Sequence, residues 1–132
     1  MPGLSLPRGA RLTRHRDVRR PLDHGRSSAS GGVVVYAWGR GDELPSRFAL
    51  VVGGRWGDAP VRNRVRRLLR ESFRTARPDL PAGFDLVLLP RRPLERQRMQ
   101  EVREHLVRAA NGAVRRFREE GPGVPRAVAA KP

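Results

Sequence analysis

The sequence is as informative in what it lacks as in what it contains. It has no cysteine, so neither a disulfide nor a thiolate metal site can form. Its apolar runs, of which Val33–Trp38 and Phe84–Leu89 are examples, are too short to span a bilayer. The first residues contain no apolar stretch of the kind that a secretory signal peptide needs. These absences favour a cytoplasmic protein with no membrane partner.

The arrangements of residues typical of a protein active site are also missing. The histidines, His15, His24 and His105, are scattered and do not have the spacing of metal ligands. The acidic residues sit mostly among arginines or in loops, where we can place no general acid and base side by side. Gly53-Gly54 is not followed by the Lys-Ser/Thr of a nucleotide-binding loop. We therefore expect no catalytic residue and no metal-binding residue in this chain.

Positive charge is abundant. The 132 residues include 28 Lys and Arg against 13 Asp and Glu, which gives a net charge of +15. Lysine occurs only at Lys131, and we interpret this preference for arginine partly as a result of genome composition. The sign and size of the net charge nevertheless indicate that the partners of the protein are polyanions.

The stretch Ala59–Arg74 has the apolar spacing of one face of a helix. Asp58 is a suitable N-cap, and Pro60 is tolerated in a first turn because its missing N–H has no partner there. The residues that form this face follow one another at helical steps: Val61, Val65, Leu68, Leu69 and Phe73.

The opposite face of the same helix is almost entirely basic, with six arginines against the single acid Glu71. Like charges four residues apart repel by a few tenths of a kcal/mol per pair. A merely solubilising face is the simple alternative, but this repulsion favours a polyphosphate ligand that relieves it. Guanidinium groups grip phosphates with two hydrogen bonds and stack on bases, which suits a nucleic acid.

The rest of the chain predicts a small α+β domain. A short helix over residues 12–22 would place Leu12, Val18 and Leu22 on one side, although Pro21 should end it near Arg20 or kink it. The other expected elements are strands at Val33–Trp38 and Arg47–Val52, paired as an antiparallel hairpin, a central apolar strand at Phe84–Leu89, and a long helix over residues 95–119. Gly25–Gly32 reads as a flexible connector that could add a short strand.

These elements follow the order α-β-β-β-α-β-α. They predict a single-domain α/β sandwich of the α+β class, with a central, mostly antiparallel sheet of about four strands and helices packed on one face. We expect the domain to cover residues 11–120, between a flexible segment at 1–10 and a disordered tail at 121–132.

The basic helix, with the sequence APVRNRVRRLLRESFR, resembles the "RNR" signature of the bacterial ribonuclease P protein component. The resemblance covers about residues 11–118. It includes Arg11-Leu12 with Asp17 and His24-Gly25, the strand Val33–Tyr36, and Phe84–Pro93, which ends in LLPRRP. It implies a left-handed β-α-β crossover, as in the second domain of ribosomal protein S5.

The resemblance also implies a function. In that family a ribonucleoprotein endonuclease removes the 5′ leader of precursor tRNA, and its RNA subunit hydrolyses the phosphodiester with Mg²⁺ that the RNA mainly holds. The partners would be ribonuclease P RNA and precursor tRNA, with no obligate protein partner. The RNA-binding residues would be Arg55, Arg62, Asn63, Arg64, Arg66, Arg67, Arg70 and Arg74. The leader-binding cleft would be formed by Val18, Leu22, Val34 and Tyr36.

The sequence departs from the family at two places. Family members commonly have phenylalanine where this chain has Val18 and Leu22, so stacking on leader bases is lost there. The loop before the basic helix is often Ser-Lys-Lys, whereas Gly53-Gly54-Arg55 keeps one positive charge.

Two other functions are compatible with the same charge. One is a structural RNA-binding protein of the ribosomal kind with no role in cleavage. The other is a DNA-binding domain that reads the major groove with its arginine helix. Asn63 is the uncharged member of the basic face, and we expect it to make a positioning hydrogen bond, unless it is a helix-surface residue without a role.

Overall fold

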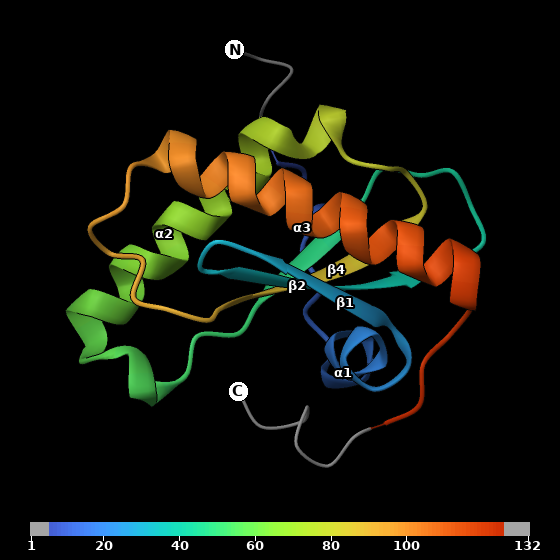
Figure 1. Ribbon diagram of the computed structural model, residues 1–132, viewed down its shortest axis with the longest axis horizontal. Helices are drawn as coiled ribbons and strands as arrows, with labels where there is room; N and C mark the ends of the chain where they lie inside the picture. The colour runs from blue at the N-terminus through green and yellow to red at the C-terminus, as the bar shows by residue number, and fades with distance from the viewer. Residues whose placement is uncertain (1–5, 126–132) are drawn as a thin grey trace.

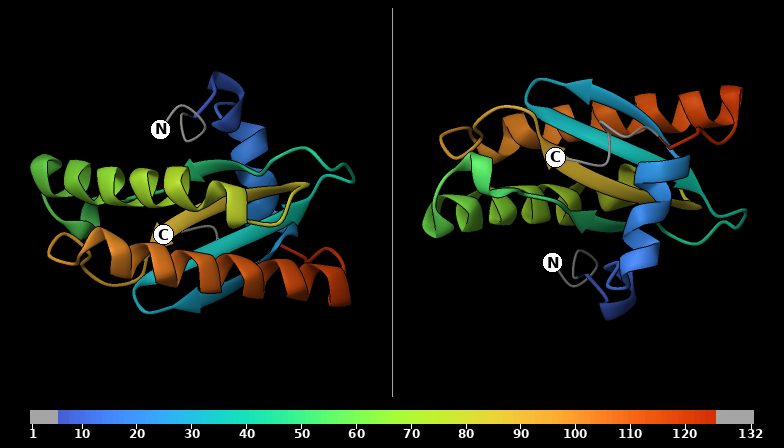
Figure 2. Two further views of the ribbon diagram at one scale, coloured as in Figure 1. Left: turned by 90° about the horizontal axis from the view of Figure 1, so that it is seen from above. Right: turned by 90° about the horizontal axis from the view of Figure 1, so that it is seen from below.

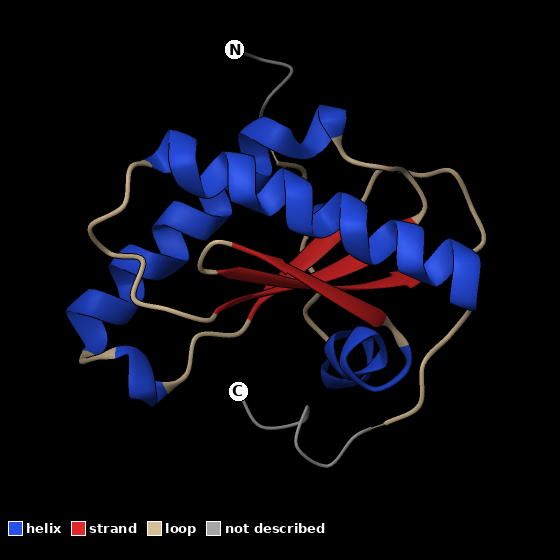
Figure 3. Ribbon diagram, viewed as in Figure 1, coloured by secondary structure: helices blue, strands red, loops and turns tan. Residues whose placement is uncertain are grey.

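The computed structural model describes residues 6–125, and its elements follow the predicted order (Figures 1 and 3). Short 3₁₀ helices lie at Arg8–Ala10, Gly54–Trp56 and Arg77–Asp79. The main elements are α1 (His15–His24), β1 (Arg26–Ser30), β2 (Val33–Gly39), β3 (Arg47–Leu50), α2 (Ala59–Ala76), β4 (Phe84–Pro90) and α3 (Met99–Glu120).

The strands form one mixed sheet in the order β1-β2-β4-β3. The β1–β2 and β2–β4 pairs are antiparallel, while β3 and β4 are parallel. Every residue of β4 is buried, which confirms its predicted central place. The predicted hairpin between β2 and β3 is wrong because β4 lies between them. Because β4 is apolar throughout, it needs a neighbouring strand on each edge. The hairpin partner of β2 is instead β1, and the turn between them is made at Gly31, whose φ is +57°.

The parallel pair β3 and β4 is joined by α2, and this crossover is left-handed (Figure 2). Such connections are right-handed in nearly all proteins, so the connection is an exception to a strong rule. It places α2 over the β3 edge of the sheet, next to α3.

The sheet is covered on both faces (Figure 2). Side chains alternate along β2, so Val33, Val35 and Ala37 pack with α2 and α3, while Val34 and Tyr36 face α1. The expectation that all helices share one face is therefore wrong for α1. The second face of the sheet is also apolar, and α1 covers part of it.

Helix α1 differs from the predicted 12–22 segment at both ends. Leu12 donates its backbone N–H to the carbonyl of Phe48 at 2.7 Å and so belongs to the edge of the sheet rather than to the helix. The helix continues through Pro21 to His24, and Pro21 is buried. Its carbonyl accepts a hydrogen bond from the N–H of Gly25 at 2.9 Å, which closes the last turn.

The segment after α3 runs back across the domain. Gly123 donates its backbone N–H to the carbonyl of His24 at 2.7 Å, and Nε of Arg26 donates to the carbonyl of Gly121 at 2.9 Å. Residues 121–125 therefore lie against the end of α1 and the start of β1. The rest of the predicted tail, 126–132, and the first half of the predicted N-terminal segment, 1–5, lie outside the described residues.

Candidate nucleic-acid interface

Helix α2 is seated as its sequence predicts. The side chain of Asp58 caps the helix and accepts a hydrogen bond from the backbone N–H of Val61 at 3.2 Å. The inner face buries Val65, Leu69 and Phe73 completely, and the ring of Phe73 stacks on that of Phe48 at 4.4 Å between centroids. This burial fixes the rotation of the helix, so its basic side points away from the sheet.

The basic side of α2 is open to solvent. Asn63, Arg64 and Arg67 are exposed, while Arg62, Arg66, Arg70 and Arg74 are half-buried along its margins. Arg55, in the 3₁₀ helix before α2, is also exposed and lies over the ring of Trp56 at 4.9 Å. We call this set of eight residues, which are the predicted RNA-binding residues, the α2 basic face: Arg55, Arg62, Asn63, Arg64, Arg66, Arg67, Arg70 and Arg74.

Most of the charge on the α2 basic face is not neutralised by carboxylates in the described part of the chain. Arg74 pairs with Glu71 at 2.9 Å, and this hydrogen bond lowers the pKa of Glu71 and raises the pKa of Arg74. Within residues 6–125, no carboxylate forms an ion pair with any of the other six arginines of the set. An anionic partner would therefore meet guanidinium groups that are still available.

The fold positions Arg66 of the α2 basic face and partly buries Arg62. Nη1 of Arg66 donates to Oδ1 of Asn63 at 3.1 Å, and its Nη2 donates to the carbonyl of Val52 at 3.4 Å. Nε of Arg62 is buried and has no hydrogen-bond partner in the described part of the chain. The sequence suggested either a hydrogen bond from Asn63 to a ligand or no role for it, and its contact with Arg66 was missed. A spacing of three residues on a helix is the signal that would have suggested this contact.

A second candidate surface lies on the opposite face of the sheet. Val18 and Leu22 of α1 and Val34 and Tyr36 of β2, the four predicted cleft residues, are all half-buried and lie in one apolar cluster with Val51. We call these five residues the α1 face. They pack on a buried layer made of Leu12, Ala49, Val87 and Leu89.

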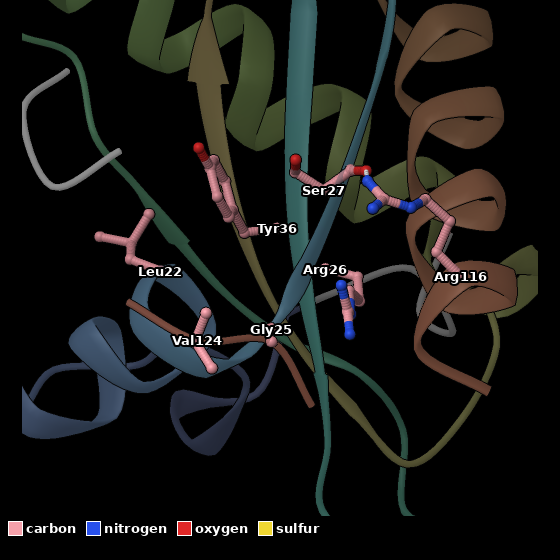
Figure 4. A pocket seen from close by; sticks show the side chains of 8 residues that line it. Leu22, Gly25, Arg26, Ser27, Tyr36, Arg116 and Val124 are labelled. Carbon is pink, nitrogen blue, oxygen red and sulfur yellow. Dashed lines mark hydrogen bonds between the residues drawn. The ribbon is translucent and has the colours of Figure 1, made fainter. Parts of the chain in front are cut away.

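One end of the α1 face is hollowed into a pocket of about 100 Å³ (Figure 4). Leu22, Tyr36 and Val124 line one side of it, and Arg26 and Arg116 lie on the other. The two arginines are tied to backbone carbonyls, Arg116 to that of Ser27 at 2.7 Å and Arg26 to that of Gly121 at 2.9 Å. No local pattern in the sequence predicts that residues 121–125 close this pocket, because their partners lie almost a hundred positions earlier in the chain.

The two surfaces meet at the end of β3. The carbonyl of Val52 accepts the hydrogen bond from Arg66, and the preceding residue, Val51, belongs to the α1 face. The backbone N–H of Val51 donates to the carbonyl of Leu88 at 3.0 Å, which holds this connection on the central strand. A polynucleotide could therefore pass from the N-terminal half of α2 onto the α1 face.

A contrasting set of charges lies inside the domain. Asp85 of β4 is fully buried and accepts hydrogen bonds from Arg40 at 2.7 Å and from Arg47 at 2.8 Å. Burial disfavours the charge on Arg40, but hydrogen bonds to Asp42 and Asp85 outweigh this effect and raise the pKa of Arg40. The hydrogen bond to Asp85 likewise raises the pKa of Arg47. These arginines are committed to the fold.

The described residues contain neither a metal site nor a membrane span of a recognisable kind. Within residues 6–125, no three His, Asp or Glu side chains gather as they would around a metal ion. In the same range, no helix combines the length and the apolar character that crossing a membrane requires.

Comparison with known proteins places this geometry in a family. The family model described as Ribonuclease P matches residues 6–114. The ribonuclease P protein component of Oleidesulfovibrio alaskensis is 38% identical over 120 residues, which cover 80% of this chain and 96% of that relative.

Solved structures agree with the family match. The ribonuclease P protein of Thermotoga maritima is similar with a TM-score of 0.67 and 35% identity, covering 80% of this chain and 96% of that one. The ribonuclease P protein of Staphylococcus aureus, at 23% identity, shares the fold with a TM-score of 0.64 over 80% of this chain and 93% of that one.

Proposed function

The chain belongs to the ribonuclease P protein family, and on this premise we propose that it binds the catalytic RNA through α2 and the 5′ leader of precursor tRNA on the α1 face. The observation that carries the proposal is the α2 basic face, where six of the seven arginines form no ion pair with a described carboxylate. A folded RNA is the polyanion that would use such a surface in a ribonucleoprotein.

The α2 basic face suits RNA in three ways. Exposed Arg64 and Arg67 can each neutralise a phosphate and release its counterions, which makes affinity depend on salt. Arg66 is already oriented by Asn63, so less side-chain freedom is lost when it binds. The Nε–H of Arg62 is buried and lacks a partner among residues 6–125, and it would gain one if the side chain turned outward to a phosphate oxygen.

The α1 face suits a single strand rather than a duplex. It offers half-buried apolar side chains and the ring of Tyr36, which are contacts for unstacked bases. Its junction with α2 at Val52 would let one RNA rest on α2 while the leader of a second follows the sheet. The basic residues would also screen the repulsion between the two RNAs.

In this proposal the protein is an accessory subunit of a cytoplasmic endoribonuclease. Mg²⁺ bound mainly by the RNA subunit supplies the activated water and the charge stabilisation for phosphodiester hydrolysis. The chain's own residues contribute binding and orientation. By screening phosphate charge, the α2 arginines lower the Mg²⁺ concentration that the particle needs.

A reconstitution tests the proposal. The purified protein is added to a bacterial ribonuclease P RNA at low Mg²⁺, and cleavage of precursor tRNA and affinity for precursor and mature tRNA are measured. We expect faster cleavage and a preference for the precursor. Binding to RNA without either effect would favour a structural protein of the ribosomal kind. Sequence-preferring binding to duplex DNA would favour the DNA-binding alternative.

A further inference from the structure

The side of the sheet that carries the α1 face has a second aromatic residue, Trp38. Alternate residues of a strand point to the same side, so Trp38 follows Val34 and Tyr36 along β2, about 7 Å beyond Tyr36. Trp38 is paired in register with Asp85, which is paired in turn with Arg47 of β3. It therefore lies at the end of the sheet farthest from the junction with Arg66.

Arg20 of α1 lies over the ring of Trp38. Its guanidinium carbon is 4.9 Å from the ring centroid, and both residues are half-buried. A contact of 3.7 Å between Arg20 and Asp17 helps to hold the guanidinium in place. The side chain of Arg20 keeps 35% of its surface exposed and Trp38 is only half-buried, so the pair is accessible from solvent.

The chemistry at this end differs from that of α2. Arg20 has Asp17 nearby, and Arg47 shares the buried carboxylate of Asp85 with Arg40. Since carboxylates offset these charges, the end is poorly suited to bind a phosphate. A planar guanidinium resting on an indole instead suits a nucleobase, because bases stack on both aromatic rings and arginine planes.

We propose that Trp38 and Arg20 form a stacking site for a base of the single-stranded leader, beyond the bases that lie over Tyr36. The inference rests on the proposed function, in which the leader runs from the α2 junction across the α1 face. It would supply the aromatic surface that Val18 and Leu22 lack. The ligand is a neutral base, and its recognition adds affinity without adding a phosphate contact.

Precursor tRNAs with leaders of graded length test the site. With long leaders, Trp38→Leu should weaken precursor affinity of the reconstituted particle by about 5- to 150-fold, because base–aromatic stacking is lost. With leaders too short to reach Trp38 the affinity should be unchanged, and the salt dependence should match that of the wild type at every length. Arg20→Lys keeps the charge but loses the planar guanidinium surface. With long leaders, its precursor affinity should lie between those of the wild type and Trp38→Leu.

A matched control and a direct reporter complete the test. Phe117→Leu truncates a half-buried aromatic residue on the opposite face of the sheet and should leave leader-length dependence intact. In a Trp56→Phe background, Trp38 is the remaining tryptophan, and long leaders alone should quench its fluorescence. Unfolding curves of Trp38→Leu verify that the variant is folded.

The possible failures are distinguishable. A loss of affinity in Trp38→Leu that is equal at all leader lengths, or no loss at any length, overturns the stacking site and leaves the proposed function standing. A wild-type protein that does not prefer precursor over mature tRNA overturns the proposed function itself.

Discussion

Helices α2 and α3 lie side by side on one face of the sheet, yet their outer surfaces differ in charge (Figure 2). Both bury an apolar stripe in the same core. Along its length α2 carries six arginines and one glutamate, whereas α3 carries five arginines and four glutamates. Genome composition would enrich arginine in both helices alike. The scarcity of acids on α2 therefore indicates a function, and the balanced surface of α3 is that of an ordinary solvated helix.

The largest expected effect is on stability, because α2 and α3 both pack a leucine into the same core. Leu69 of α2 and Leu106 of α3 are both completely buried. Leu69→Ala and Leu106→Ala should each lower the free energy of unfolding by about 2–5 kcal/mol, as measured by chemical denaturation. Met99→Ala at the start of α3, where the residue is 41% exposed, should change it by no more than about 0.5 kcal/mol. An unchanged free energy of unfolding in either leucine variant would show that the corresponding helix does not pack its leucine into the core as described.

A smaller effect concerns the positioning of Arg66. Asn63→Ala removes the acceptor for Nη1 of Arg66 but no charge. We expect affinity for ribonuclease P RNA to fall by about fivefold, the value of one net hydrogen bond, with an unchanged salt dependence. The matched substitution on α3, Asn111→Ala at an exposed position, should have no effect on affinity. Equal affinities for Asn63→Ala and the wild type would remove Asn63 from the interface.

The smallest effect concerns the single acid of α2. Glu71→Gln removes the carboxylate that pairs with Arg74 and should raise RNA affinity by about twofold, while Glu104→Gln on α3 should not. The hydrogen bond from Arg74 lowers the pKa of Glu71. The ion pair therefore stabilises the fold fully at pH values above the ordinary pKa of glutamate. This contribution is lost as the pH falls through the lowered value. A titration of binding in which Glu71→Gln and the wild type differ most at acidic pH would contradict this account.

The local features of the sequence predicted most of the fold and the α2 basic face. Helix α2 repeats one period over many residues and has a clear N-cap, so its two faces could be assigned before the structure was known. The pairing of the strands could not be predicted in the same way. Adjacency along the chain favoured a β2–β3 hairpin, whereas the burial of β4 decides the strand order. Contacts made by α1, such as Arg20 with Trp38, depend on which side of the sheet the helix occupies, and periodicity does not specify that side.

The central claim is that RNA binds the outer surface of α2 and not the protein's positive charge in general. The decisive measurement is the dependence of ribonuclease P RNA affinity on salt for two double variants, Arg64→Gln with Arg67→Gln on α2 and Arg108→Gln with Arg115→Gln on α3. All four arginines are exposed, and each double variant removes the same charge. The account predicts that the logarithmic salt slope falls by about 1.5 to 2 for the α2 variant and stays at the wild-type value for the α3 variant. Equal slopes for the two variants would contradict it.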